Sequence, residues 1–392
     1  MNIAIVSVHV LPADIPAIAR ELSSSHRVTV YTRRNSPDRK PRVKVATGVT
    51  IEYVDAGPAE NLPENALMPH IAAFSAQLRQ RWSKERPDVV HAHSWTGGLA
   101  AVAGADGMDI PIVQTFHQLG SSRIRPGGGQ EQAARARLER AIGRRADAVI
   151  ASCVSEGEEL IRLGVPRKHI AVVPHGVDTE RFRRQGPSLA RAERPRLVHV
   201  GHITQGGGAH TAIRALEGIP GAELLIAGGP VAGAPDTESD LERLRLLAKE
   251  CGVEDRVTLL GHVPHNAIAK LVRSADVVLS LPVAAPNGKV ALEAMACGVP
   301  VVASAVGAHM DSVVDGVTGL LVRPTDPGAI ARRTRLLLGD LTRRTALGFA
   351  GADRAGSRYS MERISRELVR VYDTVTGRAE LVEAEAEEAE AA

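Results

Sequence analysis

Short apolar runs alternate with longer amphipathic patterns from the first residues onward. Residues 3–8 follow Met1 directly and predict a buried strand. Six later runs predict further strands of one parallel sheet, at residues 28–31, 49–54, 89–91, 112–115, 148–151 and 170–173, with helices such as 133–145 between them. This alternation is typical of a doubly wound α/β domain.

A second series of strand-length runs begins at residue 196. It continues through residues 222–227, 256–260, 277–281, 301–303 and 320–322. The polar segment 179–195 between the two series has no apolar periodicity, so we interpret it as a hinge. The sequence therefore predicts two Rossmann-like domains, 1–184 and 185–358. Parallel strands present their ligand-facing loops at their carboxyl ends, which predicts a ligand cleft between the domains.

The end of the chain divides into two parts. Residues 361–375 carry Ile364, Leu368, Val371 and Tyr372 at helical spacing, which predicts a packed amphipathic helix. Residues 379–392 are mostly Glu and Ala without an apolar stripe, so we expect a solvated acidic tail. A role of this tail in binding a partner remains an alternative.

Composition and charge exclude several classes of protein. Hydrophobic residues make up 44% of the 392 residues and aromatic residues only 3%, which argues against a platform that stacks nucleic acid bases. The chain has a small net charge of +3, and its basic residues are scattered along the sequence. We therefore expect no nucleic acid partner. No signal peptide and no apolar run of the roughly 18 residues needed for a transmembrane segment are present, which predicts a soluble, cytoplasmic protein.

The three cysteines, Cys153, Cys251 and Cys297, lack the spacing of a metal site. Their odd number fits a reducing compartment. We predict no metal site and no cofactor.

One segment, residues 286–302, joins a glycine turn, a helix with a carboxylate and a buried strand. It resembles the sugar-nucleotide signature of retaining glycosyltransferases of the GT-B fold, family 4. Further segments match the same family in order over nearly the whole chain, at residues 88–95, 112–117, 172–178, 257–263, 275–279 and 315–322. The resemblance is to the actinobacterial branch that includes inositol-phosphate and sucrose-type glycosyltransferases.

The resemblance implies an α/β GT-B fold in which the terminal helix, 359–376, completes the first domain. It implies a hexosyltransferase that moves a sugar, with retention, from a nucleotide-sugar donor to a hydroxyl acceptor. The donor would be linked to UDP, GDP or dTDP and held mainly by the second domain, and the acceptor would be a small molecule or a glycan contacted by the first. The oligomeric state stays open.

Several residues take expected roles from this resemblance. Glu293, near the amino end of its helix, would accept two hydrogen bonds from the ribose diol. Asn287, Gly288 and Lys289 lie at the start of that helix, where backbone N–H groups can face the sugar or the diphosphate. Gly201, at the end of a strand, would permit close approach to phosphates.

His117 is the candidate catalytic residue, because the family places a histidine against the transferred sugar there. Most of these positions also have a purely structural alternative: an ordinary strand-to-helix turn for Asn287 and Gly288, a turn glycine for Gly201, a core histidine for His117 and a first-turn glutamate for Glu293.

Four departures from the family pattern fall at phosphate or sugar contacts. His202 stands where the family has arginine, Gly207 where it has lysine, and Ala285 where it has the first of two glutamates. The glycine-rich loop after the first strand is replaced by residues 8–12, which lead into a helix opened by Asp14 and Pro16.

Two explanations of these departures compete. An active transferase would hold the diphosphate with the Gly206–Gly208 turn, a protonated His202, Lys289 or a metal ion. A degenerate paralogue would keep the fold and act as a binding or auxiliary subunit. A GT-B nucleotide-sugar epimerase shares the architecture and is a further alternative. A nicotinamide-dependent dehydrogenase is disfavoured, because no G-x-G-x-x-G follows the first strand.

Overall fold

The computed structural model describes residues 1–9, 14–120, 129–191, 193–204, 206–229, 237–284 and 287–378. The chain divides into two compact units. Unit 1 contains Met1–Pro174 and the chain from Ile364 onward, and unit 2 contains His175–Arg363. The predicted boundary at 184/185 therefore differs from the division between the units by the stretch 175–184.

The stretch 175–184 belongs to unit 2 because its apolar side chains are buried there. Val177 and Phe182 are each 1% exposed and lie in the core cluster of unit 2. The Arg273 guanidinium also donates to the backbone carbonyls of Arg181, Arg183 and Pro187. Much of the polar segment predicted as a hinge is thus attached to unit 2.

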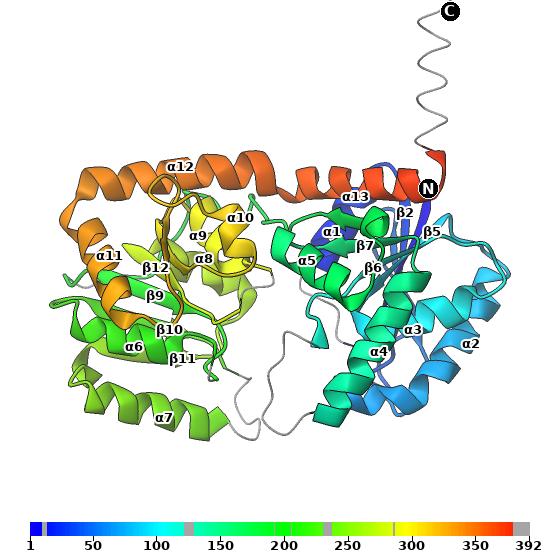
Figure 1. The fold of residues 1–392 in the computed structure, drawn as a ribbon, viewed down its shortest axis with the longest axis horizontal. Coiled ribbons are helices and arrows are strands. Elements are labelled where there is room, and N and C mark those ends of the chain that lie inside the picture. Colours follow the sequence, from blue (N-terminus) through cyan, green and yellow to red (C-terminus); the bar gives the residue numbers. More distant parts are fainter. Residues whose placement is uncertain are drawn as a thin grey trace, which may run out of the picture. The chain divides into compact units, whose positions relative to one another are not determined.

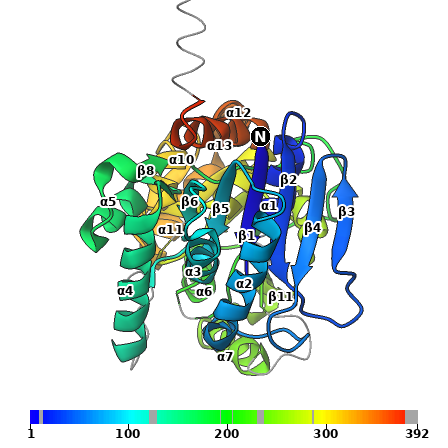
Figure 2. The same ribbon diagram turned by 90° about the vertical axis from the view of Figure 1, so that its right-hand side faces the viewer.

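Unit 1 is built around an eight-stranded sheet with the order β3-β4-β2-β1-β5-β6-β7-β8. Figure 2 shows its strands from β2 to β6 side by side. The strands are β1 (Asn2–Ser7), β2 (Arg27–Arg33), β3 (Arg42–Ala46), β4 (Val49–Val54), β5 (Val89–His93), β6 (Ile112–Thr115), β7 (Ala148–Ala151) and β8 (Ile170–Val172). All seven strands predicted for this half are confirmed.

The seven predicted strands pair in parallel, and an eighth strand that was not predicted, β3, lies at one edge of the sheet. Strand β3 pairs antiparallel with β4, whereas every other pair in this sheet is parallel. Its residues are Arg-Val-Lys-Val-Ala, and none of them is buried. An exposed edge strand needs no continuous apolar run, so the search for buried runs missed it.

Helices cover both faces of this sheet. Helices α2 (Ile71–Trp82), α3 (Ser94–Ala105) and α4 (Gly129–Arg145) pack one after another on one face. The remaining helical segments of unit 1 are α1 (Ile15–Leu22), the 3₁₀ segments η1 (Glu64–His70) and η3 (Arg167–His169), α5 (Val154–Leu163) and most of α13 (Met361–Val375). The terminal helix has the predicted bounds, and its Tyr372 is fully buried in unit 1.

Unit 2 contains a six-stranded parallel sheet with the order β11-β10-β9-β12-β13-β14. Its strands are β9 (Arg196–Val200), β10 (Glu223–Ala227), β11 (Val257–Gly261), β12 (Val277–Ser280), β13 (Val301–Ser304) and β14 (Leu320–Val322). All six predicted strands are confirmed. The sheet order reverses between β9 and β12, and a reversal of this kind marks the usual ligand side of an open α/β sheet, at the carboxyl ends of the strands.

Two separate apolar clusters flank this sheet. One cluster contains α6 (Ala209–Glu217), α7 (Thr237–Glu250) and α11 (Pro327–Gly339), and the other contains α8 (His265–Arg273) and α9 (Lys289–Ala296). Helix α12 (Leu341–Tyr359) packs along α9, as Figure 1 shows in the orange and yellow part of the chain. The short α10 (Ala308–Ser312) and the 3₁₀ segment η4 (Glu254–Arg256) complete the unit.

Candidate functional site

The turn after β9 is shaped by close backbone contacts. A Cβ at Gly207 would lie 1.8 Å from the carbonyl oxygen of His202, and a Cβ at Gly208 would lie 2.4 Å from that of Leu281. Gly208 also has φ +99° and precedes α6 as its N-cap. Neither position has room for a side chain. Gly207 is therefore required by the turn itself, and a lysine at this position is incompatible with the observed backbone.

The polar groups of this turn are only partly available to a ligand. The Gly207 N–H donates to the Thr204 carbonyl at 3.0 Å, and the Gly206 carbonyl accepts from the Val283 N–H at 2.9 Å. The His202 side chain is exposed. The Gly207 N–H, one of the amides predicted to bind a diphosphate, is thus already used within the turn. The first N–H groups of α6 come next along the chain, and amides at a helix start attract anions.

His199 lies under this turn as a fully buried residue of β9. Its Nδ1 is 2.8 Å from the Leu279 carbonyl oxygen, whereas its Nε2 has no hydrogen-bond partner in the described part of the chain. Burial lowers the pKa of His199 to about 4, so the ring is neutral at pH 7. A Cβ at Gly201 would lie 3.5 Å from that free Nε2. The neutral His199 ring thus lies directly beside the Gly201 backbone.

The start of α9 brings a second set of predicted residues to the same edge of the sheet. Gly288 is its N-cap with φ +57°, and a Cβ there would lie 3.1 Å from the Ala308 Cβ. The Asn287 side-chain oxygen accepts from the Lys289 N–H at 3.3 Å. The Lys289 side chain is half-buried and has no ion-pair partner among the described residues. This helix start therefore carries an available cation beside backbone donors.

Glu293 lies one turn into α9, so the structural alternative of a first-turn glutamate does not apply. The helix begins at Lys289, and its first turn contains no acidic residue. The carboxylate is 3% exposed, and its Oε1 lies 2.9 Å from Nε2 of His265, the first residue of α8. Its other oxygen has no hydrogen-bond partner in the described ranges. A buried carboxylate with one oxygen still available is a strong acceptor for a hydroxyl pair.

A row of histidines lies at the carboxyl ends of β5 and β6 in unit 1. His117 is half-buried with φ +62°, and its Nε2 is 2.8 Å from Nδ1 of His93. The rings of His91 and His93 are 4.2 Å apart. A non-glycine residue with positive φ is uncommon and is often found at functional sites. The predicted candidate His117 is thus held by a neighbour that lies 24 residues earlier in the sequence.

His91 connects this row to the terminal helix. Its Nδ1 is 2.7 Å from the Tyr372 hydroxyl, and its Nε2 is 2.8 Å from the Thr115 hydroxyl. Burial, with a smaller contribution from the charge of His117, lowers the pKa of His91 to about 3. Burial likewise raises the pKa of Tyr372. Both groups are therefore neutral at pH 7 and act as fixed hydrogen-bonding partners.

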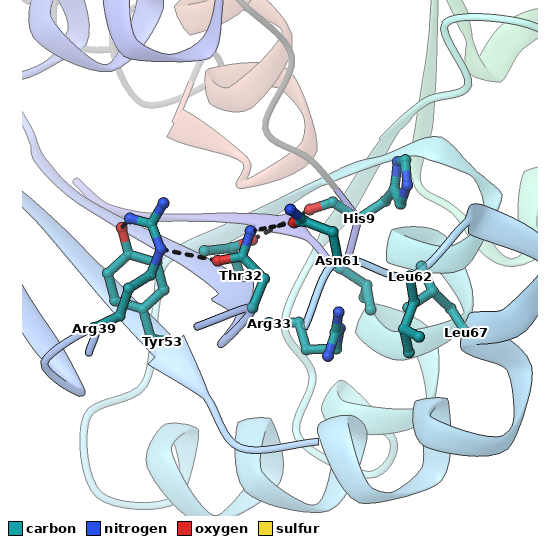
Figure 3. A pocket seen from close by; sticks show the side chains of 10 residues that line it. His9, Thr32, Arg33, Arg39, Tyr53, Asn61, Leu62 and Leu67 are labelled. Atoms are coloured by element: carbon teal, nitrogen blue, oxygen red, sulfur yellow. Dashed lines mark hydrogen bonds between the residues drawn. The ribbon is translucent and has the colours of Figure 1, made fainter. Parts of the chain in front are cut away.

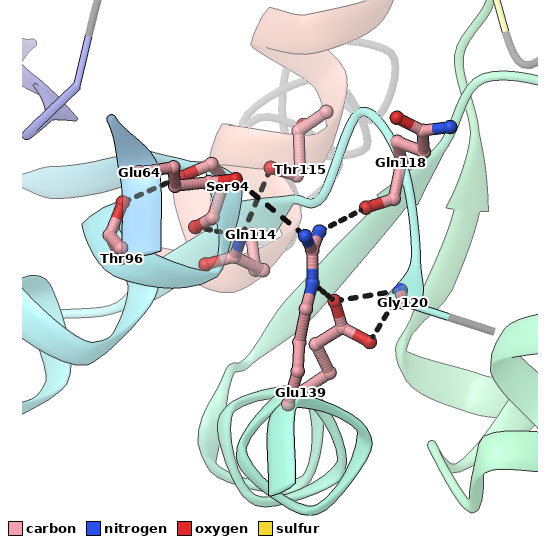
Figure 4. Close-up of polar contacts among 9 residues, drawn as sticks. Glu64, Ser94, Thr96, Gln114, Thr115, Gln118, Gly120 and Glu139 are labelled. Atoms are coloured by element: carbon pink, nitrogen blue, oxygen red, sulfur yellow. Dashed lines mark hydrogen bonds and ion pairs between the residues drawn. The ribbon is translucent and has the colours of Figure 1, made fainter. Parts of the chain in front are cut away.

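A buried ion pair, absent from the sequence prediction, fixes the backbone directly after His117 (Figure 4). Both carboxylate oxygens of Glu139, which is fully buried, accept from the Gly120 N–H at 3.0 Å. The Arg135 guanidinium donates to Glu139 at 2.7 Å and to the Gln118 carbonyl at 2.7 Å. It also lies 3.6 Å from the Glu64 carboxylate. Burial raises the pKa of Glu139, against the opposing effects of Arg135 and Gly120.

The predicted residues therefore fall into two groups. Gly201, His202, Gly207, Gly288, Lys289 and Glu293, together with Asn287, lie in unit 2, and His117 lies in unit 1. Ala285 and residues 10–12 lie outside the described residues. Within the described ranges, no group of three or more His, Cys, Asp or Glu side chains is arranged to hold a metal ion. No described helix combines the length and the apolar character needed to cross a membrane.

Comparison with known proteins establishes the family to which this chain belongs. The family model Glycosyltransferase Family 4 matches residues 17–181, and Glycosyl transferases group 1 matches residues 180–354. A D-inositol 3-phosphate glycosyltransferase of Xylanimonas cellulosilytica is 34% identical over 410 residues, covering 96% of this chain and 97% of the relative. The chain belongs to glycosyltransferase family 4. It is a GT-B glycosyltransferase that transfers a sugar from a nucleotide-sugar donor.

Solved structures agree with this assignment. Sucrose-phosphate synthase from Thermosynechococcus elongatus has a TM-score of 0.86 at 26% identity, covering 96% of this chain and 99% of the other. An Anabaena protein solved in complex with UDP-glucose has a TM-score of 0.75 at 18% identity, covering 96% and 100%. The resemblance to the GT-B fold and to family 4 that the motifs carried is thus confirmed.

Proposed function

We propose that this glycosyltransferase uses a UDP-linked hexose and transfers the hexose, with retention, to a hydroxyl group of a small polyol. The observation that carries the proposal is the Glu293 carboxylate, which is buried, oriented by His265 at 2.9 Å and still has one oxygen available for a ribose diol. The Anabaena structure with UDP-glucose supports the choice of nucleotide, and the inositol phosphate transferase supports a polyol acceptor.

The diphosphate needs donors other than the usual arginine and lysine pair. Since Gly207 has no room for a side chain, we assign the diphosphate to the first amides of α6, with Lys289 and the exposed His202 as side-chain donors. Amides fixed by a helix start need no reorganisation when charge develops on the leaving diphosphate, which is the condition for stabilising that charge. This assignment favours an active transferase over a degenerate paralogue.

His117 is proposed to contact the transferred sugar. Its Nε2 is bonded to His93, so the ring is oriented before a ligand arrives. The ion pair of Arg135 and Glu139 holds residues 118 and 120, which follow His117 directly. Fixing a contact residue from both sides reduces the entropy lost when the substrate binds.

Product analysis tests the proposal. Purified enzyme is incubated with UDP-glucose, GDP-mannose or dTDP-glucose, each with and without myo-inositol, myo-inositol phosphate or glucose as acceptor. The expected result is release of UDP that depends on an acceptor, with a product whose anomeric configuration, measured by NMR, matches that of the donor. Conversion of the donor sugar to its epimer without an acceptor would indicate an epimerase. Nucleotide binding without turnover of any donor would indicate an auxiliary subunit.

A further inference from the structure

Gln114 is a fully buried amide on β6, an inner strand of the unit 1 sheet, outside the residues assigned to the sugar and the nucleotide. It lies beside Ala92 of β5, one residue before the end of its own strand. The preceding residues, Ile112 and Val113, are apolar, as burial in a parallel sheet requires. A glutamine at such a position needs an explanation, because a buried amide is stable only where its polar atoms find partners.

The amide nitrogen of Gln114 has two partners, which belong to two different segments of chain. Nε2 donates to the Ser94 carbonyl and to the Thr115 carbonyl, at 3.0 Å each (Figure 4). The opposite orientation of the amide would put its oxygen against two carbonyl oxygens, so these contacts fix which side the nitrogen takes. One side chain thereby ties the backbone at the end of β5 to the backbone at the end of β6.

The other end of the amide is costly to the fold. Its oxygen, Oε1, is buried and has no hydrogen-bond partner in the described part of the chain. The facing helix α3 has a glycine there, and a Cβ added to Gly98 would lie 2.4 Å from Oε1. The cost of this unpaired oxygen is therefore offset only by the two hydrogen bonds of the nitrogen.

Both tied segments carry a histidine of the row at the carboxyl ends of β5 and β6. His93 directly precedes Ser94, and His117 follows Thr115 by two residues. Ser94 has φ +60° and His117 has φ +62°, so each segment contains a non-glycine residue in the left-handed region. Such residues persist only where the surrounding structure holds them. The bonds of Gln114 supply this support beside the 2.8 Å contact between Nδ1 of His93 and Nε2 of His117.

We propose that Gln114 is a positioning residue for His117, the histidine assigned to the transferred sugar. Its amide nitrogen holds one carbonyl after His93 and one before His117, and so keeps the two rings in contact. Arg135 and Glu139 hold the chain after His117, whereas Gln114 holds it before His117 and joins it to β5. This inference rests on the proposed function, because the role of His117 in transfer is part of that proposal.

The bonds of Gln114 are separate from the cavity of the same unit. A cationic pocket of about 180 Å³ opens at the carboxyl ends of β1, β2 and β4 (Figure 3). Its polar lining includes Thr32, Arg33, Arg39 and Tyr53. Neither Gln114 nor its two acceptors belong to this lining. Loss of the amide is therefore expected to leave the cationic pocket unchanged, so an effect on transfer can be attributed to the histidine pair.

Transfer kinetics of Gln114→Met test this role, because methionine is a flexible, unbranched side chain that lacks the amide. Displacing a contact residue by about 1 Å can cost about 100-fold in rate. With the donor and acceptor that support turnover, we expect kcat to fall at least about tenfold, and UDP, whose proposed site lies in unit 2, to bind as in the wild type. A smaller decrease of kcat in folded Gln114→Met protein would refute the inference, as would a parallel loss of UDP affinity.

Ser75→Ala is the matched control for a loss of stability. Ser75 is also buried in unit 1, and its hydroxyl donates to the Ile71 carbonyl at 2.8 Å. Both residues belong to α2, which contributes nothing to the bonds around the histidine pair. This variant should lower the thermal midpoint and leave kcat unchanged. An equal decrease of kcat in Ser75→Ala and Gln114→Met would mean that Gln114 acts through stability alone, which contradicts a positioning role.

The histidine pair can also be observed directly by NMR. In protein with isotope-labelled histidine, the imidazole N–H between His93 and His117 should give a downfield proton resonance, which is assigned by its loss in His93→Asn. We expect Gln114→Met to shift or remove this resonance, and an unchanged resonance would refute the inference. If Gln114→Met does not fold, the same measurements use Gln114→Met combined with Ser94→Gly, since glycine adopts φ +60° without support from the amide.

These measurements separate the inference from the proposed function. Unimpaired transfer by folded Gln114→Met protein would overturn the inference while the proposed function stands. Absence of transfer by the wild type from every nucleotide sugar would refute the proposed function. The resonance of the histidine pair would then decide by itself whether Gln114 holds the two rings together.

Discussion

Replacing Glu293 by alanine is the most direct test of the donor site. The carboxylate is 3% exposed and makes one described hydrogen bond, with His265, so the second oxygen and part of the first are available to a ribose diol. Loss of the charge-assisted hydrogen bonds is expected to cost roughly 1.5 to 3 kcal/mol of binding free energy. At about 1.4 kcal/mol per factor of ten, this corresponds to UDP binding that is about 10- to 150-fold weaker.

The variant should remain folded, because the partner of Glu293 can return to water. The His265 side chain is 40% exposed, so its lost hydrogen bond is replaced by solvent. We expect a decrease of about 1 kcal/mol in the free energy of unfolding, which is small for a domain of this size. Circular dichroism and a thermal melt establish that the variant is folded before binding is measured.

Isothermal titration calorimetry with UDP provides the assay. Glu293→Gln keeps one acceptor oxygen without the charge and should fall between the wild type and Glu293→Ala. Glu223→Ala is the control, because Glu223 is also mostly buried and paired, with Arg196 at 2.6 Å, but begins β10 at the amino end of the sheet. Unchanged UDP affinity in folded Glu293→Ala protein would refute the role given to this carboxylate.

Three further outcomes follow from the structure. Gly207→Ala should weaken UDP binding and lower the thermal midpoint by several degrees. The added Cβ would lie 1.8 Å from the His202 carbonyl oxygen, and such overpacking costs about 1 to 3 kcal/mol. An unchanged thermal midpoint would contradict the turn geometry. His199 has a folded pKa of about 4 against about 6.5 when unfolded, so its contribution is complete above pH 6.5 and is lost as the pH falls towards 4, by up to about 3 kcal/mol. Denaturant titrations between pH 7 and 4 should therefore show a flatter pH dependence for His199→Gln than for the wild type. Tyr372→Phe removes the hydroxyl that lies 2.7 Å from His91 Nδ1 and should lower the free energy of unfolding by about 1 to 3 kcal/mol in urea titrations. Equal urea midpoints for the variant and the wild type would show that this hydrogen bond does not stabilise the fold.

The candidate donor residues could be found from the sequence because they lie on two short stretches of chain, 201–207 and 287–293. In the second stretch, the turn at Asn287 and Gly288 and the carboxylate of Glu293 fall within seven residues, a spacing that local backbone geometry alone constrains. The partner of Glu293 could not be found in this way. His265 lies 28 residues earlier on another helix, and only the packing of α8 against α9 brings the two side chains within 2.9 Å.

The role of Gly207 shows how sequence comparison can mislead. Comparison with the family pattern shows only that Gly207 stands where the family has a lysine, which suggests a lost phosphate contact. In the folded turn it is the residue that permits His202 and the start of α6 to approach, since any Cβ would meet a backbone carbonyl. A steric requirement of this kind depends on an atom five residues away in the chain, and no property of glycine itself reveals it.

The sequence by itself determined the two α/β halves, because burial on both faces of a parallel sheet requires continuous apolar runs that can be recognised locally. It also determined the terminal amphipathic helix and the family motifs. The tertiary structure decided what depends on distant groups: the pairing of Tyr372 with His91, 281 residues apart, the support of His117 by His93, and the cationic pocket at Arg33 and Arg39. Periodicity records whether a side chain is buried, whereas the charge and hydrogen bonds it meets there are set by chain segments that only folding brings together.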